Sequence, residues 1–435
     1  MSNMMKKSLN ILVILATMAV ALNMASCSDD ELGATIFDTN EYPLDRHAYT
    51  FPLDTFIKKN FLEQYNMRYI YRMQYISSDK DKNLTPATYE NSCKLAVLTK
   101  YLWYDVYDDV AAGKSEFLKE YSPRIIHVIG SKNLNTSSGT ETLGVTEGGT
   151  KVTLYRVNLL DPNDIDNMNE YFFETMHHEF GHILDNTKLH PTPFNVLSQG
   201  RYNAAGWNET PDSVAASQGF ISNYASMSYT EDWVETFARY ITNDTVTMER
   251  MFNTADYEWE IVDLKDFNKD LEVDSTDYFA QLKGTYDIDT IGYLKGDESG
   301  KNEHKVYRRV CKRDADDHVV LDENGAVQWT KNISGARQII NDKIRFVREY
   351  MKTQYGINID ELRKEIQEKQ FRKGADGKFL TVSKPVMAYY DGRSYKLRDN
   401  LQQLNAITYK DPVTGKSQLD LLLDVLEEYK KLQIK

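Results

Sequence analysis

Residues 175–184, Thr-Met-His-His-Glu-Phe-Gly-His-Ile-Leu, decide the fold of this chain because they join a helical pattern to two histidines four positions apart. Upstream, Asp161 is a suitable helix cap and Pro162 suits the first helical position, and large apolar residues then recur at helical spacing. His178 and His182 therefore project from one face of a predicted helix, since four residues make about one turn.

The side chains of this motif are those of a metal site. Two neutral imidazoles on one face can bind Zn²⁺, and the carboxylate of Glu179 is placed to take a proton from a water on that metal. Gly181 weakens the middle of the helix by about 1 kcal/mol relative to alanine, so we expect another element to pack closely there. The alternative is a buried helix whose two histidines are hydrogen-bonded and hold no metal.

A zinc site of this kind needs a third protein ligand and one position left for water. A second predicted helix, from Ser228 to Tyr240, carries Glu231 and Glu235 one turn apart. Two carboxylates that face the same way repel each other unless a cation or a proton lies beside them. One could bind the metal while the other accepts the outer N–H of a ligand histidine. The spacing leaves open which does which, and Glu231 could instead complete a capping box with Ser228.

The two motifs together resemble gluzincin metallopeptidases and are similar to the catalytic domain of the anthrax lethal factor. That resemblance implies that Glu231 is the zinc ligand and that Glu235 holds the ligand histidine. It also implies a role for Tyr224, seven residues before Glu231, as a phenol that donates a hydrogen bond to the oxyanion formed when water attacks a carbonyl. A further likeness at 340–346 falls in a helix that would close the domain.

Three other histidines are expected to lie outside the metal site. His177 points about 100° away from His178 along the helix, so we predict a core residue or one that lies behind the ligands. His190 is predicted to lie on a surface loop, with a substrate contact as the alternative. His127 occupies an inward position of a predicted strand, and we assign it no chemistry.

The first residues of the chain predict export. Lys6 and Lys7 precede an apolar stretch at 9–22, and small residues lead to Cys27, a pattern typical of a secretory signal rather than a spanning helix. Cys27 resembles the lipidated residue of a bacterial lipobox. The acidic run at 28–31 resembles the tag of surface-exposed lipoproteins that serve TonB-dependent nutrient import. The resemblance implies an outer-membrane lipoprotein anchored through Cys27, exposed at the cell surface and associated with an import complex. A plain cleaved signal is the alternative.

The chain is acidic, with a formal net charge of −13 at pH 7. Removal of a signal at 1–26 takes away two lysines and no acid, which moves this charge to −15. Such a surface repels nucleic acid and anionic membranes, so we predict no nucleic-acid partner. Two cysteines remain besides Cys27. Cys93 falls on the buried side of a predicted helix, and we expect it and Cys311 to be unpaired core thiols.

We predict an α+β fold: a zincin-like metallopeptidase domain with a mixed sheet, the helix of the His-Glu-x-x-His motif and the glutamate helix, followed by inserted and C-terminal additions. The chain is too long for one small core. The predicted parts are a lipoprotein signal peptide at 1–26, an acidic tether at 27–50, the catalytic domain at 51–250, an insertion at 251–330, and a C-terminal helical region at 331–435 that closes the catalytic domain.

The predicted sheet lies before the metal-site helix. A helix at 89–104 is followed by strands at 124–129 and 151–158, with a Gly/Ser/Thr-rich loop at 131–149 between them. We expect the strand at 151–158 to be the sheet edge that pairs with an extended peptide across the metal. The turn-rich stretch at 190–224, between the two metal-site helices, is expected to shape the cleft.

Residues 266–277 resemble a dockerin-type EF-hand loop, which predicts a calcium site. Leu271 stands where such a loop needs glycine for its turn, so an ordinary helix cap is the alternative. The same insertion predicts a hairpin through 305–310 and 319–329. Helices are predicted downstream at 336–355, 361–371 and 417–433.

These patterns predict a zinc-dependent metallopeptidase on the cell surface that hydrolyses peptide or glycoprotein substrates before import. Two alternatives remain open. The chain could be a non-catalytic accessory lipoprotein that captures a ligand for an importer, although such a protein has no need of the base Glu179. It could also hydrolyse an amide that is not part of a peptide.

Overall fold

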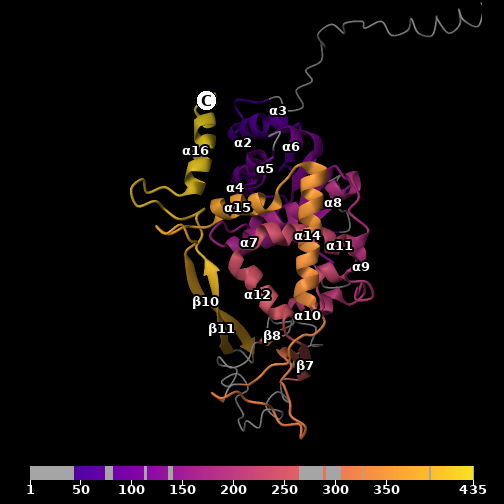
Figure 1. The fold of residues 1–435 in the computed structure, drawn as a ribbon. Coiled ribbons are helices and arrows are strands. Elements are labelled where there is room, and N and C mark those ends of the chain that lie inside the picture. The colour runs from indigo at the N-terminus through magenta and orange to yellow at the C-terminus, as the bar shows by residue number, and fades with distance from the viewer. Residues whose placement is uncertain are drawn as a thin grey trace, which may run out of the picture. The chain divides into compact units, whose positions relative to one another are not determined.

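The fold is taken from a computed structural model that describes residues 44–73, 82–111, 115–135, 141–263, 288–290, 305–325, 327–390 and 393–434 (Figure 1). Contacts join residues 46–435 into one unit. The predicted boundaries at 250 and 330 stay predictions. The helices of the described part are α2 Phe51–Ile57, α3 Glu63–Tyr65, α4 Tyr89–Thr99, α5 Asp105–Val110, α6 Ser115–Tyr121, α7 Ile165–Met168, α8 Glu174–Thr187, α9 Pro193–Val196, α10 Asp212–Ser217, α11 Tyr229–Thr242, α12 Thr245–Ala255, α14 Ala336–Tyr355, α15 Ile359–Gln370 and α16 Gln418–Lys430.

A mixed four-stranded sheet supports the metal-site helix, as the α+β prediction requires. Its order is β1-β2-β6-β5, with β1, β2 and β6 parallel and β5 antiparallel to β6. The strands are β1 Arg68–Ile70, β2 Ile125–Val128, β6 Lys151–Leu154 and β5 Gly144–Glu147. The helices and this sheet confirm the mixed α+β class.

The predicted sheet edge is wrong. The strand that begins at Lys151 has β2 on one side and β5 on the other, so β5 is the edge. This strand comes from the segment predicted as a loop. Gly148 and Gly149 both adopt positive φ, at 58° and 67°, and reverse the chain so that β5 folds back onto β6. The paired glycines are the hairpin signal in the sequence.

The helix that carries the histidines begins later than predicted. Asp164 caps α7 by accepting a hydrogen bond from the backbone N–H of Asn167, whereas Asp161 bonds to Asn163 in the preceding turn. A π-helical turn at Asn169–Phe173 then connects α7 to α8. The predicted helix therefore runs without a break from Ile165 to Thr187, with a π-turn whose extra residue changes the direction in which the side chains of α8 point.

Large aromatic side chains fix the inner face of α8. Phe180 is fully buried and packs edge-on against Trp103 at 5.0 Å and Tyr107 at 5.4 Å between ring centroids. Burial of each such ring contributes roughly 1.5–3 kcal/mol. The opposite face of α8, which carries His178 and His182, is thereby directed away from the core.

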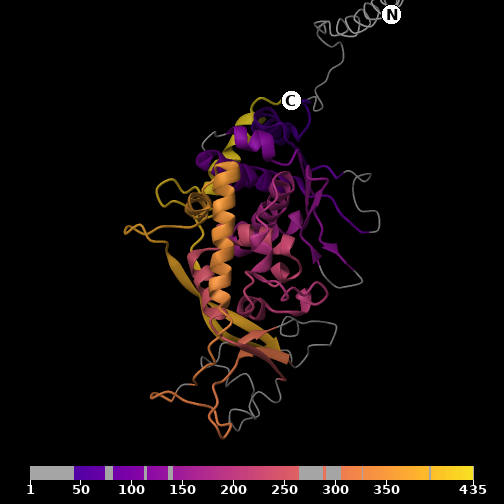
Figure 2. The same cartoon turned by 45° about the vertical axis from the view of Figure 1, so that its right-hand side comes forward.

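Helix α11 packs directly on α8 (Figure 1). Gly181 lies at this contact. A Cβ atom at Gly181 would lie 3.1 Å from Cγ1 of Val234 and 3.4 Å from Cδ1 of Phe237. The close packing predicted at this glycine is therefore confirmed. Figure 2 shows the long helix α14, which contacts α11 on another side.

The region after α12 differs from its prediction. Residues 305–309 form β9, which pairs with β7 Trp259–Asp263 and β8 Ile288–Thr290 rather than with 319–329. The segment after β9 folds on itself through isolated bridges such as Cys311 with Trp329. The remaining strands are β3 Asn133–Leu134 with β4 Glu141–Thr142, and the hairpin β10 Thr381–Tyr390 with β11 Arg393–Gln403. The calcium loop predicted at 266–277 lies outside the described residues.

Cys93 is free and buried, as predicted, and Cys311 is buried as well. In the part of the chain that the structure describes, no helix combines the length and apolar character needed to cross a bilayer.

Candidate metal centre

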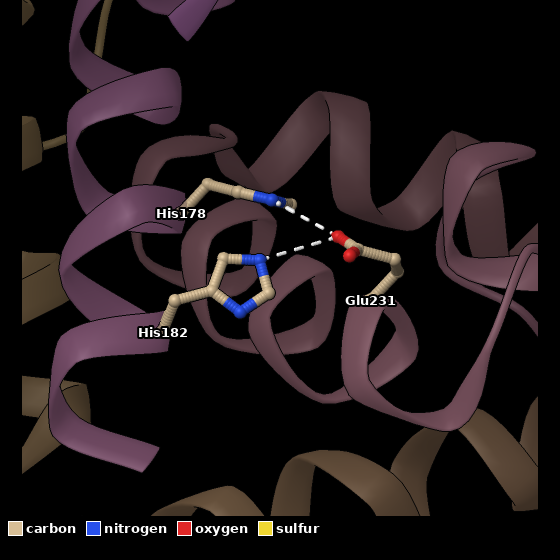
Figure 3. A group of neighbouring side chains, drawn as sticks. All are labelled: His178, His182 and Glu231. Carbon is tan, nitrogen blue, oxygen red and sulfur yellow. Dashed lines mark ion pairs between the residues drawn. The ribbon is translucent and has the colours of Figure 1, made fainter. Parts of the chain in front are cut away.

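His178 and His182 on α8 meet Glu231 on α11 (Figure 3). One oxygen of Glu231, Oε2, lies 3.2 Å from Nε2 of His178 and 3.3 Å from Nε2 of His182. The two imidazole rings are 4.9 Å apart. Two nitrogens and one carboxylate oxygen thus converge from two helices that are far apart in the sequence.

This donor set fits a zinc ion. Oε2 of Glu231 is buried and has no aligned hydrogen-bond donor among the described residues, so its negative charge needs a cation. Burial disfavours the charged imidazole of His178, but Glu231 and Glu235 outweigh it and raise the pKa of His178 to about 10. Burial also disfavours the carboxylate of Glu231, but the two histidines lower its pKa to about 2. A metal ion can supply the charge that a proton on His178 otherwise supplies. Two imidazoles and one carboxylate form a ligand set that Zn²⁺ takes in catalytic sites.

The two glutamates of α11 occupy different sides of His178. Oε1 of Glu235 lies 2.8 Å from Nδ1, the ring nitrogen that points away from Glu231. An N–H at Nδ1 that donates to Glu235 leaves the lone pair of Nε2 directed at the point where the donors converge. Ser228 caps α11 through the backbone N–H of Glu231 at 3.3 Å, while the Glu231 side chain turns to the histidines. The geometry thus places Glu231 in the group that could hold a metal ion and Glu235 behind His178.

Glu179 is buried beside the metal ligands and is held by the edge strand. Oγ1 of Thr146 on β5 donates a hydrogen bond to Oε2 of Glu179. The strand reaches this close because Gly144 has no side chain: a Cβ there would lie 2.4 Å from Cγ2 of Thr175 and 3.5 Å from Oε1 of Glu179. Thr146 and Gly144 were missed in the sequence because their segment was predicted to be a loop.

Tyr224 lies against the site on a short 3₁₀ turn, Tyr224–Ser226. Its ring stacks on that of His178 at 5.7 Å between centroids, and Trp207 packs edge-on against the Tyr224 ring at 4.7 Å. Burial raises the pKa of the Tyr224 phenol, and Glu231, Glu235 and Glu179 raise it further. The phenol is therefore protonated at neutral pH and able to donate a hydrogen bond.

Comparison with known proteins gives the family. The family described as "Putative zinc-binding metallo-peptidase" matches residues 47–360, a stretch that contains all of the residues above. The chain belongs to this family. A crystal structure of a putative zinc-binding metallo-peptidase from Bacteroides caccae ATCC 43185, at 2.10 Å resolution, is similar at 26% identity; the match covers 77% of this chain and 95% of that one, with a TM-score of 0.48. No curated protein matches the chain.

Three further histidines of this metallo-peptidase family member do not belong to the group formed by His178, His182 and Glu231. His177 is fully buried, its Nδ1 lies 2.9 Å from the hydroxyl of Tyr107, and burial lowers its pKa to about 3. His127 is also buried, as its strand position predicted. His190 lies in the loop after α8, as predicted, but its side chain points inward and is only 5% exposed. Its nitrogens lie 2.8 Å from Asp185 and from Asn195, and its ring stacks on Trp233, so His190 fastens the loop after α8.

Two polar residues behind the metallo-peptidase centre were also missed in the sequence. Ser222 and Arg239 both donate hydrogen bonds to Oε2 of Glu235, at 2.5 Å and 3.0 Å. Arg239 stands one helical turn after Glu235, and this spacing was a usable signal. Ser222 comes from the turn-rich stretch between the helices, where the sequence offers no comparable signal.

Proposed function

We propose that this protein is a zinc-dependent metallopeptidase in which His178, His182 and Glu231 hold the metal and Glu179 is the catalytic base. The observation that carries the proposal is the convergence of one atom each from His178, His182 and Glu231 beside the buried Glu179, which lies on the helix of the two histidines. The arrangement of the two helices resembles that of gluzincins and of zincin-like domains in general. A zinc ion bound there would polarise a substrate carbonyl and acidify water.

The residues of the chain have separate tasks in this reaction. Glu179 accepts the proton of the attacking water and returns it to the nitrogen of the leaving amine. Thr146 restrains one carboxylate oxygen of Glu179, which leaves the other to receive the proton. Tyr224 donates its phenolic hydrogen bond to the oxyanion that develops on the attacked carbonyl. Glu235 keeps the ring of His178 in one orientation throughout.

Strand β5 is the proposed docking edge for the substrate. Among the described strands it pairs with β6 alone, so its outer edge can hydrogen-bond to an extended peptide. Thr146 lies on this strand and touches Glu179, which would bring a peptide paired there close to the base. This favours a peptide or an unfolded segment of a protein or glycoprotein as the substrate.

The proposed setting is the cell surface. The pattern that ends at Cys27 and the acidic residues that follow it support an outer-membrane lipoprotein whose lipid is carried on that cysteine. The same features support work beside a TonB-dependent importer, with the enzyme trimming substrates before uptake. A surface with this negative charge is unsuited to nucleic acid.

The test is cleavage of a diverse peptide pool followed by mass spectrometry. The wild type and Glu170→Gln, which changes an exposed carboxylate upstream of α8, should give the same products. Glu179→Gln should bind zinc with the same stoichiometry and lose at least about 100-fold in rate, because a general base contributes on the order of 10²–10⁴-fold. A wild type that binds zinc but cleaves nothing would instead favour a protein that captures its ligand without hydrolysing it.

A further inference from the structure

The carboxylate of Glu235 has three partners from three parts of the chain. Its Oε1 faces Nδ1 of His178 at 2.8 Å, and its Oε2 accepts hydrogen bonds from Ser222 and Arg239. The side chain is only 7% exposed. A carboxylate bound on both oxygens cannot rotate without breaking a charge-assisted hydrogen bond, so its partners determine where it can hold His178.

Arg239 is itself held between acidic groups. Its Nε lies 3.3 Å from Oε1 of Glu174, and its Nη1 lies 3.9 Å from Oδ2 of Asp212. The other oxygen of Glu174 accepts a hydrogen bond from Thr242 at 3.3 Å. Without Arg239, Glu174 would be a buried carboxylate with no cation beside it among the described residues, and Glu235 would keep only His178, which is strongly unfavourable.

Ser222 connects the same carboxylate to the turn that carries Tyr224. While its hydroxyl donates to Glu235, its oxygen accepts the backbone N–H of Ala225 at 3.0 Å. Asp212 holds the neighbouring residue of this turn by accepting the backbone N–H of Asn223 at 2.8 Å. The metal ligand and the proposed oxyanion donor are therefore attached to one hydrogen-bonded network.

We infer that Arg239 and Ser222 are positioning residues of the metal centre. They act through Glu235, which they hold so that His178 keeps Nε2 directed at the metal, and Ser222 also fixes the turn of Tyr224. The inference rests on the part of the proposed function that places zinc at His178, His182 and Glu231. It does not depend on hydrolysis, because its first consequence is on metal affinity.

The first test compares zinc affinities of the full chain by competition with a chromophoric chelator. Arg239→Met should weaken zinc binding about 10-fold to 100-fold, the range expected when a residue behind a metal ligand is lost. Arg239→Lys keeps the charge but loses the forked guanidinium, so its zinc affinity should lie between those of the wild type and Arg239→Met. Arg363→Met is the matched control. Arg363 on α15 donates a hydrogen bond to the carbonyl of Tyr240 on α11, the helix that also carries Arg239. Its loss tests for a general loss of packing and should leave zinc affinity unchanged.

The second test uses two serines of one turn and is independent of whether Arg239→Met folds. Ser222→Ala removes the hydroxyl that reaches Glu235 and should weaken zinc binding about 3-fold to 10-fold. Ser226→Ala removes a hydroxyl that donates only to the carbonyl of Asn223 at 2.6 Å, and it should bind zinc as the wild type does. The d–d spectrum of the Co²⁺-substituted protein should change in Ser222→Ala and not in Ser226→Ala.

The outcomes separate this inference from the proposed activity. Wild-type affinity in Arg239→Met and Ser222→Ala would overturn the inference, as would equal losses in those variants and their controls. If the wild type binds zinc, the affinities order as stated and no peptide is cleaved, the proposed hydrolysis fails and the inference stands. If the wild type binds no zinc, both fail together.

Discussion

Helix α11 carries two consecutive acidic residues, Glu231 and Asp232, and each belongs to a different cluster of charged side chains. On the side of α14, Oδ2 of Asp232 lies 2.6 Å from Nζ of Lys343 and accepts a hydrogen bond from Tyr202 at 3.0 Å, and neither charged residue is exposed. On the side of α8, Glu231 faces two histidines, and no lysine or arginine pairs with it among the described residues.

The difference lies in where the compensating cation comes from. A buried carboxylate is costly unless it is paired, and Lys343 pairs with Asp232 from within the chain. Lys343 also donates to the carbonyl of Gly219 at 2.7 Å, so this cluster ties three segments together. Glu231 has no such partner and can be neutralised by a proton or by a metal. The comparison separates a cluster that is neutralised within the chain from one that could bind a cation.

Zinc binding should show the largest effect and tests the second cluster. Glu231→Ala and His182→Ala each remove a ligand and should weaken zinc binding by more than about 1,000-fold, so that dialysed protein contains no stoichiometric zinc. Glu235→Ala removes only the partner of His178 and should weaken it about 10-fold to 100-fold. Metal analysis and chelator competition measure both. If Glu235→Ala loses zinc and Glu231→Ala retains it, the two glutamates have been assigned the wrong way round.

Changes in the cluster of Asp232 and Lys343 should alter the stability of the fold. Lys343→Met leaves Asp232 buried without its cation and should lower the free energy of unfolding of the metal-free protein by about 3–5 kcal/mol. The double variant Asp232→Leu with Lys343→Met removes both charges and should recover most of that loss. Urea unfolding monitored by circular dichroism measures the difference. A single variant as stable as the wild type would remove the contrast between the two clusters.

The smallest expected effect concerns a buried histidine, His127, whose nearby carboxylate, Glu147, does not offset the effect of burial. Both ring nitrogens of His127 are buried without a hydrogen-bond partner among the described residues, and burial, with help from Lys151, lowers its pKa to about 4. Because this folded-state pKa lies below the unfolded value near 6.5, its contribution to stability is present above about pH 6.5 and is lost as the pH falls towards 4. His178, beside two carboxylates, shifts in the opposite direction.

His127→Leu should therefore be less sensitive to acid than the wild type. The drop in free energy of unfolding between pH 7 and pH 4 should be smaller by about 2 kcal/mol in the variant, allowing for partial solvent screening. Paired urea titrations at the two pH values give this number. An equal drop in both proteins would show that the pKa of His127 is the same in the folded and unfolded states, which contradicts the prediction.

Much of the centre was predictable because it depends on local spacing. The four-residue step between His178 and His182, and that between Glu231 and Glu235, place side chains on one face of any helix. The packing expected at Gly181 followed from the same reasoning. The long helix α14 was also predicted with its observed bounds, since its apolar stripe repeats over many turns.

The errors arose where pairing across the chain decides the structure. Strand β5 is short and comes from a Gly/Ser/Thr-rich stretch, so its strand character depends on the reversal at Gly148 and Gly149 and on the presence of β6. The burial of the His190 side chain was not predicted, because its packing on Trp233 and its hydrogen bonds to Asp185 and Asn195 cannot be seen in a sequence. Short segments carry too little periodic signal to outweigh such contacts.

The sequence by itself determined which chemical groups the protein can bring to a metal: two histidines and a base on one helix, and a pair of carboxylates on another. Helical periodicity is a local property, and it requires no knowledge of the partner helix. Only the tertiary structure decided that Nε2 of each histidine meets Oε2 of Glu231, that Glu235 stands behind His178, and that Asp232 is neutralised by Lys343. Those distances depend on how α8, α11 and α14 pack, which is set by side-chain contacts between residues far apart in the chain.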